Sequence, residues 1–224
     1  MRDSRRLWIR DEFDQQIAHF VLNEDEYRLS SLHASGRPVR RVLDVGGHVG
    51  SFTRAVKTYW PGCEVIAVEP NPESARYFRL NTSGLPGVTL HDVAIVAEDG
   101  PATVSIVWPG DRNAAACQTR YLSAGGHEVP SREEVVAATS IMNVLTAHGC
   151  PDIDIVKLDC EGPEAMILEE LQRHGYLYRV GWICGEWHGR PNIPLIKDAL
   201  AATHQLTLYE HEHPWGAFFG EPRT

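Results

Sequence analysis

The sequence lacks the long apolar segments and cysteine patterns that mark several classes of protein. None of its apolar stretches approaches the roughly 20 residues that a bilayer-spanning helix needs, and its N-terminus has no apolar run of signal-peptide length. Its five cysteines are widely spaced and include no C-x-x-C pair, which argues against a disulfide framework or a zinc cage. We therefore expect a cytoplasmic protein without a membrane partner.

Positive charge is also scarce. Lysine and arginine number 21 against 30 aspartates and glutamates, so the formal net charge is −9 and the pI is about 5.6. Such a surface repels phosphate backbones, and the basic cluster of Arg2, Arg5, Arg6 and Arg10 is confined to the N-terminal end. We therefore do not expect nucleic acid as a partner.

The order of apolar segments predicts the fold class. The 224 residues fit one domain, 1–224, with a substantial core. Short apolar runs alternate with segments of helical periodicity, which indicates βαβ units and a mostly parallel, doubly wound α/β sheet. The expected strands are Arg41–Val45, Glu64–Glu69, Gly87–Val93, Ile153–Leu158 and Val180–Cys184.

Three further segments complete the expected architecture. Residues 1–38 carry apolar side chains at roughly helical spacing and predict a helical cap beside the sheet. Residues 109–132 are rich in Gly, Ala, Ser and Asn and exceed the usual length of a connection, so we expect a flap on the substrate side. Leu206–Tyr209 and Ala217–Phe219 predict a closing antiparallel strand pair.

A glycine-rich loop follows the first expected strand. It contains Gly46, Gly47, His48 and Gly50, and glycines allow a tight turn and a close approach of the backbone to a ligand. A nicotinamide-binding loop usually reads G-x-G-x-x-G, whereas here two glycines are adjacent and Asp44 precedes them. A carboxylate at that place would repel a pyrophosphate but attract the amino group of a methionine moiety. The loop therefore favours S-adenosylmethionine as the cofactor over NAD.

The ends of the next two expected strands supply further cofactor candidates. Glu69, 25 residues after Asp44, is positioned to accept hydrogen bonds from ribose hydroxyls, and Asn71 follows it. Asp92 and Val93 end the third strand, on the adenine side of such a pocket. Taken alone, the glutamate also fits a solvated strand end and Asp92 a turn.

A dense polar block follows the expected strand Ile153–Leu158. Lys157, Asp159 and Glu161 fall within five residues, at the sheet edge where substrate and cofactor should meet. Alternate residues of a strand point the same way, so the lysine and the aspartate should share a direction. The acidic residues also suit a helix start, where they stabilise the helix dipole.

Together these motifs resemble the FkbM family of methyltransferases. The resemblance rests on Asp44–Phe52, Val68–Pro72 and Lys157–Glu164 and spans roughly residues 41–190. It implies a Rossmann-like sheet and methyl transfer from S-adenosylmethionine, often to a hydroxyl oxygen of a natural product or sugar, with carboxyl oxygens as another acceptor. Gly47 and Cys160 depart from the family pattern, which more commonly has a small residue such as alanine and an aliphatic residue there.

The resemblance also implies an acid and a histidine after the expected strand Val180–Cys184. His188 is then a candidate general base, because an unperturbed imidazole titrates near neutral pH, and Glu186 would orient it or bind the acceptor. Asp159 and Glu161 are alternative bases. A surface histidine on a loop is the plain structural interpretation.

Three alternatives remain open from the sequence. Asp159 and Glu161 are hard oxygen ligands that suit a magnesium ion, although methyl transfer does not require one. An NAD-dependent oxidoreductase and a non-catalytic cofactor-binding module are the alternatives from other classes. The acceptor is expected to be a small molecule, and neither its identity nor the oligomeric state follows from the sequence.

Overall fold

A seven-stranded mixed sheet forms the centre of the structure. The computed structural model describes residues 7–109, 131–210 and 214–223. The strand order is β3 (Val88–His91), β2 (Glu64–Val68), β1 (Arg41–Val45), β7 (Ile153–Leu158), β8 (Val180–His188), β10 (Trp215–Pro222) and β9 (His204–Leu208). The first five strands are parallel, and β10 runs antiparallel to both of its neighbours. The predicted fold class and the closing antiparallel pair are confirmed.

The two central strands, β1 and β7, lie side by side although more than a hundred residues separate them in the chain. Most of their residues are buried and apolar, as is typical of parallel strands covered on two faces, and Asp44 and Lys157 are the buried charged exceptions. The chain proceeds from β1 toward one edge of the sheet and from β7 toward the other. In open α/β sheets, ligands bind at the carboxyl ends of strands at such a reversal of strand order.

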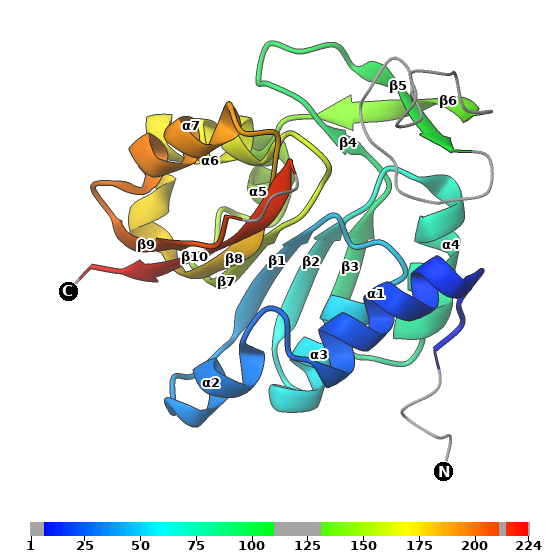
Figure 1. Ribbon diagram of the computed structural model, residues 1–224, viewed down its shortest axis with the longest axis horizontal. Coiled ribbons are helices and arrows are strands. Elements are labelled where there is room, and N and C mark those ends of the chain that lie inside the picture. Colours follow the sequence, from blue (N-terminus) through cyan, green and yellow to red (C-terminus); the bar gives the residue numbers. More distant parts are fainter. Residues whose placement is uncertain (1–6, 110–130, 211–213, 224) are drawn as a thin grey trace.

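Helices cover both faces of the sheet (Figure 1). One face packs against α5 (Ile141–Ala147), α6 (Glu164–Arg173) and α7 (Asn192–Leu200), with a short 3-10 helix at Tyr176–Arg179. The other face packs against α1 (Glu12–Asn23), α2 (Leu29–Ala34), α3 (Ser51–Tyr59) and α4 (Pro72–Thr82). Within the described ranges, no helix combines the length and the apolar character needed to cross a bilayer.

The N-terminal segment contains two helices, α1 and α2, that contribute to the core beside α3. Asp11 begins α1 as its N-cap, because its carboxylate accepts a hydrogen bond from the backbone N–H of Asp14. Asp14 is itself fully buried and pairs with Arg10. Asp14 Oδ1 also lies 3.0 Å from His48 Nε2, and Arg10 donates to Ser74 Oγ at 3.1 Å. These two contacts join the N-terminal segment to the glycine loop and to α4.

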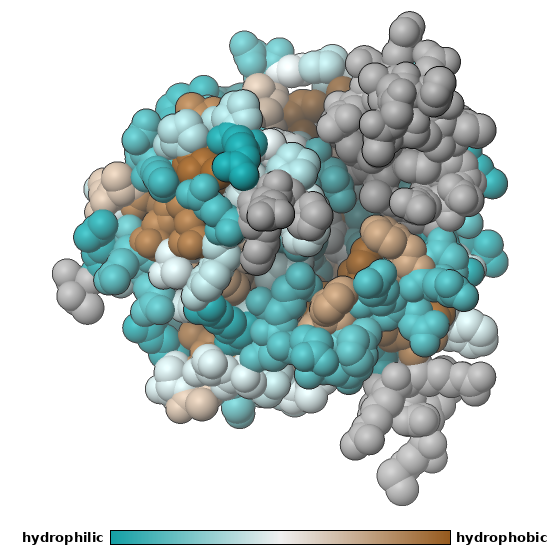
Figure 2. All heavy atoms as spheres, in the orientation of Figure 1, coloured by the Kyte–Doolittle hydropathy of each residue, from teal (hydrophilic) through white to brown (hydrophobic). Residues whose placement is uncertain are grey.

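A second, three-stranded sheet has the order β4 (Ala94–Ile95), β6 (Ser131–Thr139) and β5 (Thr103–Pro109). It lies beyond β3, at the upper right of Figure 1. The expected flap at 109–132 falls between its strands, and residues 110–130 lie outside the described part of the chain. On the lower part of the face drawn in Figure 2, teal and near-white residues predominate over brown ones.

One strand is longer than the sequence predicts. The expected strand ends at Cys184, but β8 continues to His188 because β10 pairs with it residue by residue, placing Ala217 opposite Glu186 and Trp215 opposite His188. Glu186 and His188 therefore lie on a strand and not in the loop that we expected after it. Since they are two positions apart on this strand, their side chains point to the same face.

Candidate functional site

A cavity opens at the carboxyl ends of β1, β2 and β7. Apolar side chains of α1 and of the segment from Val93 to Ile95 form part of its wall, and Ile106 of β5 closes another part. Its polar lining comes from strand ends and the loops that follow them: Gly46, Gly47, His48, Glu69, Lys157, Asp159 and Glu161. Most of the expected site residues thus meet in one place.

The glycine loop approaches two neighbouring elements very closely. The N–H groups of Gly46 and Gly47 both donate to the carbonyl of Val68 at the end of β2, at 3.0 and 2.9 Å. Gly46 has a φ of +82°, and a Cβ atom there would lie 1.7 Å from the carbonyl oxygen of Asp159. At Gly47, a Cβ atom would lie 2.9 Å from the ring of Phe78. Gly46 therefore requires glycine, which agrees with the tight turn expected from the sequence, whereas a side chain at Gly47 would displace the Phe78 ring.

Asp44 and Gly50 lie behind the cavity wall. The Asp44 side chain is fully buried; its Oδ2 atom accepts from Thr53 Oγ1 at 2.7 Å, and its Oδ1 atom lies 3.6 Å from Lys157 Nζ. Burial raises the pKa of Asp44, which the lysine and the threonine partly offset. Gly50 has a φ of +87° at the start of α3 and packs toward Phe78. Asp44 is not among the lining residues of the cavity, and its Oδ1 atom has no hydrogen-bond partner among the described residues. The attraction that we expect between Asp44 and the amino group of the cofactor, directly or through water, stays a prediction.

Glu69 presents a buried carboxylate at the cavity. Its Oε2 atom accepts from the backbone N–H of His48 and its Oε1 atom from that of Asn71, each at 2.8 Å. His48 has a φ of +48°, a conformation that turns its N–H toward this carboxylate. Burial raises the pKa of Glu69, and His48 and the two backbone donors oppose that rise. Each oxygen has further lone pairs, so the carboxylate can still accept from two ribose hydroxyls.

The remaining cofactor candidates differ in their surroundings. The side chain of Asn71 is fully buried, and its Oδ1 atom caps α4 by accepting from the N–H groups of Glu73 and Ser74. Asp92 is exposed and pairs with Arg79. Val93 lines the cavity. Val93 therefore lies where a cofactor contact is expected, whereas the Asn71 side chain caps a helix and Asp92 forms an exposed ion pair. Their expected contacts with the cofactor stay predictions.

Lys157 is the central cation of the buried network. Its Nζ atom donates to the carbonyls of Val45 and Gly46 and lies 3.6 Å from Asp44 Oδ1 and 3.5 Å from Asp159 Oδ2. Burial alone would lower the pKa of Lys157, but the carboxylates of Asp159 and Asp44 raise it above its ordinary value. The lysine is thus permanently charged and holds the ends of β1 and β7 together. We expected it among the catalytic groups, and its contacts indicate a positioning role.

Asp159 lines the cavity and lies beside an acidic cluster, formed by Glu161, Glu164 and Glu186 around His188. Its Oδ2 atom accepts from the hydroxyl of Tyr27 at 2.9 Å and faces Lys157. Burial would raise the pKa of Asp159, but Lys157, His188 and Tyr27 together lower it below its ordinary value. The side chain therefore stays ionised and carries negative charge at the carboxyl end of β7.

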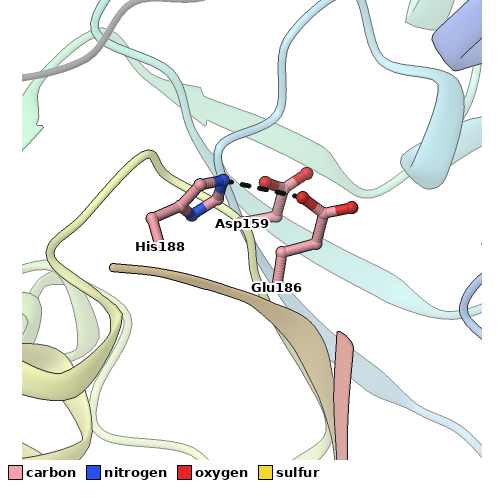
Figure 3. Close-up of side chains that lie close together, drawn as sticks. All are labelled: Asp159, Glu186 and His188. Carbon is pink, nitrogen blue, oxygen red and sulfur yellow. Dashed lines mark ion pairs between the residues drawn. The ribbon is translucent and has the colours of Figure 1, made fainter. Parts of the chain in front are cut away.

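The catalytic candidates Glu186 and His188 converge beside Asp159 (Figure 3), and Glu161 lies next to His188. His188 Nε2 lies 3.5 Å from Glu186 Oε2 and 3.7 Å from Glu161 Oε2, while its Nδ1 atom lies 2.9 Å from Glu164 Oε1. Glu164 is fully buried, and the same Oε1 atom accepts from the backbone N–H of Cys160. The histidine is thus held in one orientation by the first carboxylate of α6.

These contacts change the expected protonation states. Burial would lower the pKa of His188, but the hydrogen bond and the charge of Glu164 raise it to about 10. Burial and the charge of Asp159 raise the pKa of Glu186 to about 9, and burial raises the pKa of Glu161. At neutral pH the histidine is therefore an imidazolium and Glu186 is protonated. The expectation that His188 is a neutral base at rest disagrees with this environment.

Several residues of the site are absent from the sequence prediction. Tyr27 and Glu26 reach it from the segment between α1 and α2, and Glu26 forms a hydrogen bond with Glu186. Arg10 bonds to Asp14, and its guanidinium also lies 2.9 Å from His48 Nε2. No local pattern signals these contacts, because they join elements far apart in the chain. Glu164 could have been recognised, since it ends the polar block that carries the family resemblance.

The lining residues suit S-adenosylmethionine. The cofactor carries a positive sulfonium and an ammonium group, and the cavity offers the carboxylates of Glu69, Asp159 and Glu161 beside apolar walls. Backbone N–H groups that a pyrophosphate would need are already used within the protein, since those of Gly46 and Gly47 bond to β2. The residues present therefore fit the sulfonium cofactor better than a dinucleotide.

Comparison with known proteins finds one matching family model and several solved structures of similar fold. The family model described as the methyltransferase FkbM domain matches residues 44–216. The chain is similar in fold to the METTL16 methyltransferase domain, with a TM-score of 0.53 and 10% identity over 90% of this chain and 67% of that one. It is also similar to precorrin-6y C5,15-methyltransferase from Geobacter metallireducens GS-15, with a TM-score of 0.49 and 12% identity over 87% of each chain. No curated protein matches the chain.

Proposed function

This chain belongs to the methyltransferase FkbM domain family, and from that membership we propose that it methylates a hydroxyl oxygen of a small-molecule acceptor, such as a natural product or a sugar. Membership in the family implies the use of S-adenosylmethionine. The observation that carries the proposal is the group of Asp159, Glu161, Glu186 and His188 at the edge of the cofactor cavity. Such a group can bind and deprotonate a hydroxyl acceptor.

The residues divide into a cofactor side and an acceptor side. Glu69, held by two backbone N–H groups, is suited to bind the ribose, and the apolar wall around Val93 is suited to the adenine. The acidic cluster begins at Asp159, which lines the same cavity. We propose that the acceptor enters from the cluster, so that its oxygen faces the methyl group.

The chemistry needs positioning and one base. S-adenosylmethionine supplies a methyl group on a positively charged sulfur that an acceptor oxygen displaces in line. Glu161 is the best base within the chain, because it lines the cavity and burial raises the pKa of its carboxyl group, which strengthens it as a proton acceptor. His188, as an imidazolium, would orient this carboxylate and that of Glu186.

Two other acceptors and another class of enzyme are less well supported. A carboxylate acceptor would be repelled by the carboxylates of Asp159 and Glu161, which disfavours carboxyl methylation. The same charges disfavour NAD, because its pyrophosphate is anionic. A nucleic acid acceptor is disfavoured by the net charge of −9. The cytoplasmic location expected from the cysteine spacing stays a prediction.

Mass spectrometry tests the proposal. Purified protein is incubated with S-adenosylmethionine and a panel of hydroxylated small molecules, each paired with its deoxy and its carboxylated analogue. We expect a gain of one methyl group on hydroxylated members and none on the deoxy analogues. Glu161→Gln should lower turnover by roughly 10²–10⁴-fold, the usual share of a general base. Methylation of the carboxylated analogues alone would contradict hydroxyl specificity.

A further inference from the structure

Three side-chain atoms that could coordinate a metal ion surround one point. They lie where we propose that the methyl acceptor binds. They come from Asp159 after β7 and from Glu186 and His188 on β8, and all lie within 4.8 Å of one another. In Figure 3 the three side chains point toward one another, and the imidazole faces the two carboxylates. Ligands bound at about 2.0–2.2 Å to one metal ion are about 3–4 Å apart, so small side-chain rotations would bring these three atoms into coordination.

A second observation concerns the far side of the imidazole. His188 Nδ1 lies 2.9 Å from Oε1 of Glu164, which is fully buried and outside the three-ligand group. That carboxylate is in turn held by the backbone N–H groups of Cys160 and Gly162. Metal-binding histidines almost always donate their second ring N–H to a carboxylate or carbonyl, which fixes the tautomer and leaves the other nitrogen free to coordinate. Here that other nitrogen is Nε2, which faces Glu186.

Acidic side chains outnumber basic ones around this point. The carboxyl groups are those of Asp159, Glu161, Glu164, Glu186 and Glu26. The nearest permanent cation is Lys157, which is already shared with Asp44 and with the carbonyls of Val45 and Gly46. Arg28, on the far side of Glu26, stacks on Tyr209 and Phe219. These carboxyl groups can balance the charge of a bound divalent cation, because binding of the ion releases the protons that its ligands carry in its absence.

We propose that Asp159, Glu186 and His188 bind a divalent transition-metal ion, with Mn²⁺ as the best fit. Mg²⁺ and Ca²⁺ prefer sets made only of oxygen atoms, whereas one imidazole with two carboxylates suits a first-row transition metal. Glu164 is the positioning residue that orients the imidazole. Binding of the ion requires neutral imidazole, so the metal replaces the proton that His188 carries in its absence.

The role of the ion rests on the proposed function. A hydroxyl acceptor bound to the metal becomes more acidic, because the positive charge stabilises the alkoxide. Its proton passes to the carboxylate of Glu161, which lines the cavity 3.7 Å from His188 Nε2. The oxygen then forms a bond to the methyl carbon, the carbon–sulfur bond breaks, and its electron pair stays on the sulfur of S-adenosylhomocysteine.

Mn²⁺ binding tests the site directly, without turnover. Protein freed of metal by a chelator is titrated with Mn²⁺ in the absence of cofactor, and free Mn²⁺ is measured by electron paramagnetic resonance. We expect saturable binding of one ion per chain. Glu186→Gln should weaken it at least tenfold, and Glu164→Gln roughly 10–100-fold, the usual effect of removing a carboxylate behind a ligating histidine. Glu169→Gln, on the exposed face of α6, is the matched control and should leave binding unchanged.

A spectroscopic measurement on the unmodified protein tests the site even if the variants fail to fold. Electron spin echo modulation of the bound Mn²⁺ should show coupling to an imidazole ¹⁴N nucleus. Absence of that coupling, or binding that is the same in Glu186→Gln and Glu169→Gln, overturns the assignment. Calorimetry with S-adenosylhomocysteine on the same samples separates the two claims. If the protein binds S-adenosylhomocysteine but does not bind Mn²⁺ specifically, the metal site is wrong and the proposed function stands. If it binds neither, the proposed function is contradicted as well.

Discussion

Replacement of Lys157 by methionine tests the role of the buried cation between β1 and β7. Methionine fills most of the same volume but lacks the ammonium group, which lies 3.6 Å from Asp44 Oδ1 and 3.5 Å from Asp159 Oδ2. The variant would leave the Asp44 carboxylate buried without a positive neighbour, and the carbonyls of Val45 and Gly46 would lose their donor. We expect a large loss of folding stability.

The magnitude follows from the distances. Coulomb's law gives about 5 kcal/mol for two unit charges 3.6 Å apart at an effective dielectric constant of ~20. Removing one partner of a buried pair costs about 3–5 kcal/mol in other proteins. Lys157 is 3% and Asp44 0% exposed, so water screens this pair little. We therefore expect the free energy of unfolding at pH 7 to fall by about 3–5 kcal/mol.

Urea unfolding followed by circular dichroism measures this loss, and its pH dependence identifies the cause. Burial already raises the pKa of Asp44, and removing Lys157 raises it further. A carboxyl group whose pKa is raised by folding contributes stability below its unfolded pKa and loses that contribution as the pH rises through its folded value. The difference between wild type and variant should therefore shrink toward pH 4.

Two further variants complete the design. Lys197→Met, at an exposed position of α7, should change stability by no more than about 0.5 kcal/mol. Adding Asp44→Asn to Lys157→Met should recover part of the loss, because it removes the unpaired charge. A loss below about 1 kcal/mol at pH 7, or an equal loss at pH 4 and pH 8, would refute the reasoning from the buried carboxylate.

Three other predictions concern the surroundings of the site. Gly46→Ala should lower the free energy of unfolding by at least about 1–3 kcal/mol in thermal or urea unfolding, because the new Cβ atom meets the carbonyl oxygen of Asp159; unchanged stability would mean that the loop moves freely. In metal-free protein, Glu164→Gln should lower the pKa of His188 from about 10 toward its ordinary 6.5, as read from the imidazole resonances in an NMR titration; a value that stays near 10 would exclude Glu164 as the cause. Asp14→Asn should reduce stability more at pH 7 than near pH 2, because Arg10 and His48 outweigh burial and lower the pKa of this carboxyl group; its contribution is complete above the unfolded pKa and declines as the pH falls toward the folded value. An equal loss at both pH values would contradict this.

The fold could be predicted because local pattern and tertiary environment agree in the central strands. Segments such as Arg41–Val45 and Ile153–Leu158 are apolar, short and bounded by turn residues, and each forms the strand that the pattern predicts. The end of β8 could not be placed in the same way. Gly185 to His188 is extended because β10 pairs with it. The partner of His188 is Trp215, which lies 27 residues further along the chain.

Site residues that lie directly after a strand could be predicted from the sequence. Site residues that are brought in by contacts between distant segments could not. Glu69 and Asp159 follow their strands directly, so topology alone brings them to one cavity. Tyr27 and Glu164 determine the charge state of the cluster, but only folding brings them to Asp159 and His188. For the same reason, sequence reasoning assigned His188 an ordinary titration and could not foresee that a buried carboxylate holds it protonated.

The central claim is that the cavity binds S-adenosylmethionine through Glu69, and one calorimetric titration tests it. Wild-type protein and Glu69→Ala are each titrated with S-adenosylhomocysteine, and wild type is also titrated with NAD. We expect saturable binding of S-adenosylhomocysteine to wild type, a loss of about 1.5–3 kcal/mol in the variant from the missing hydrogen bonds to a charged group, and far weaker binding of NAD. Equal affinity of wild type and folded variant for S-adenosylhomocysteine, or tight binding of NAD alone, would contradict the claim.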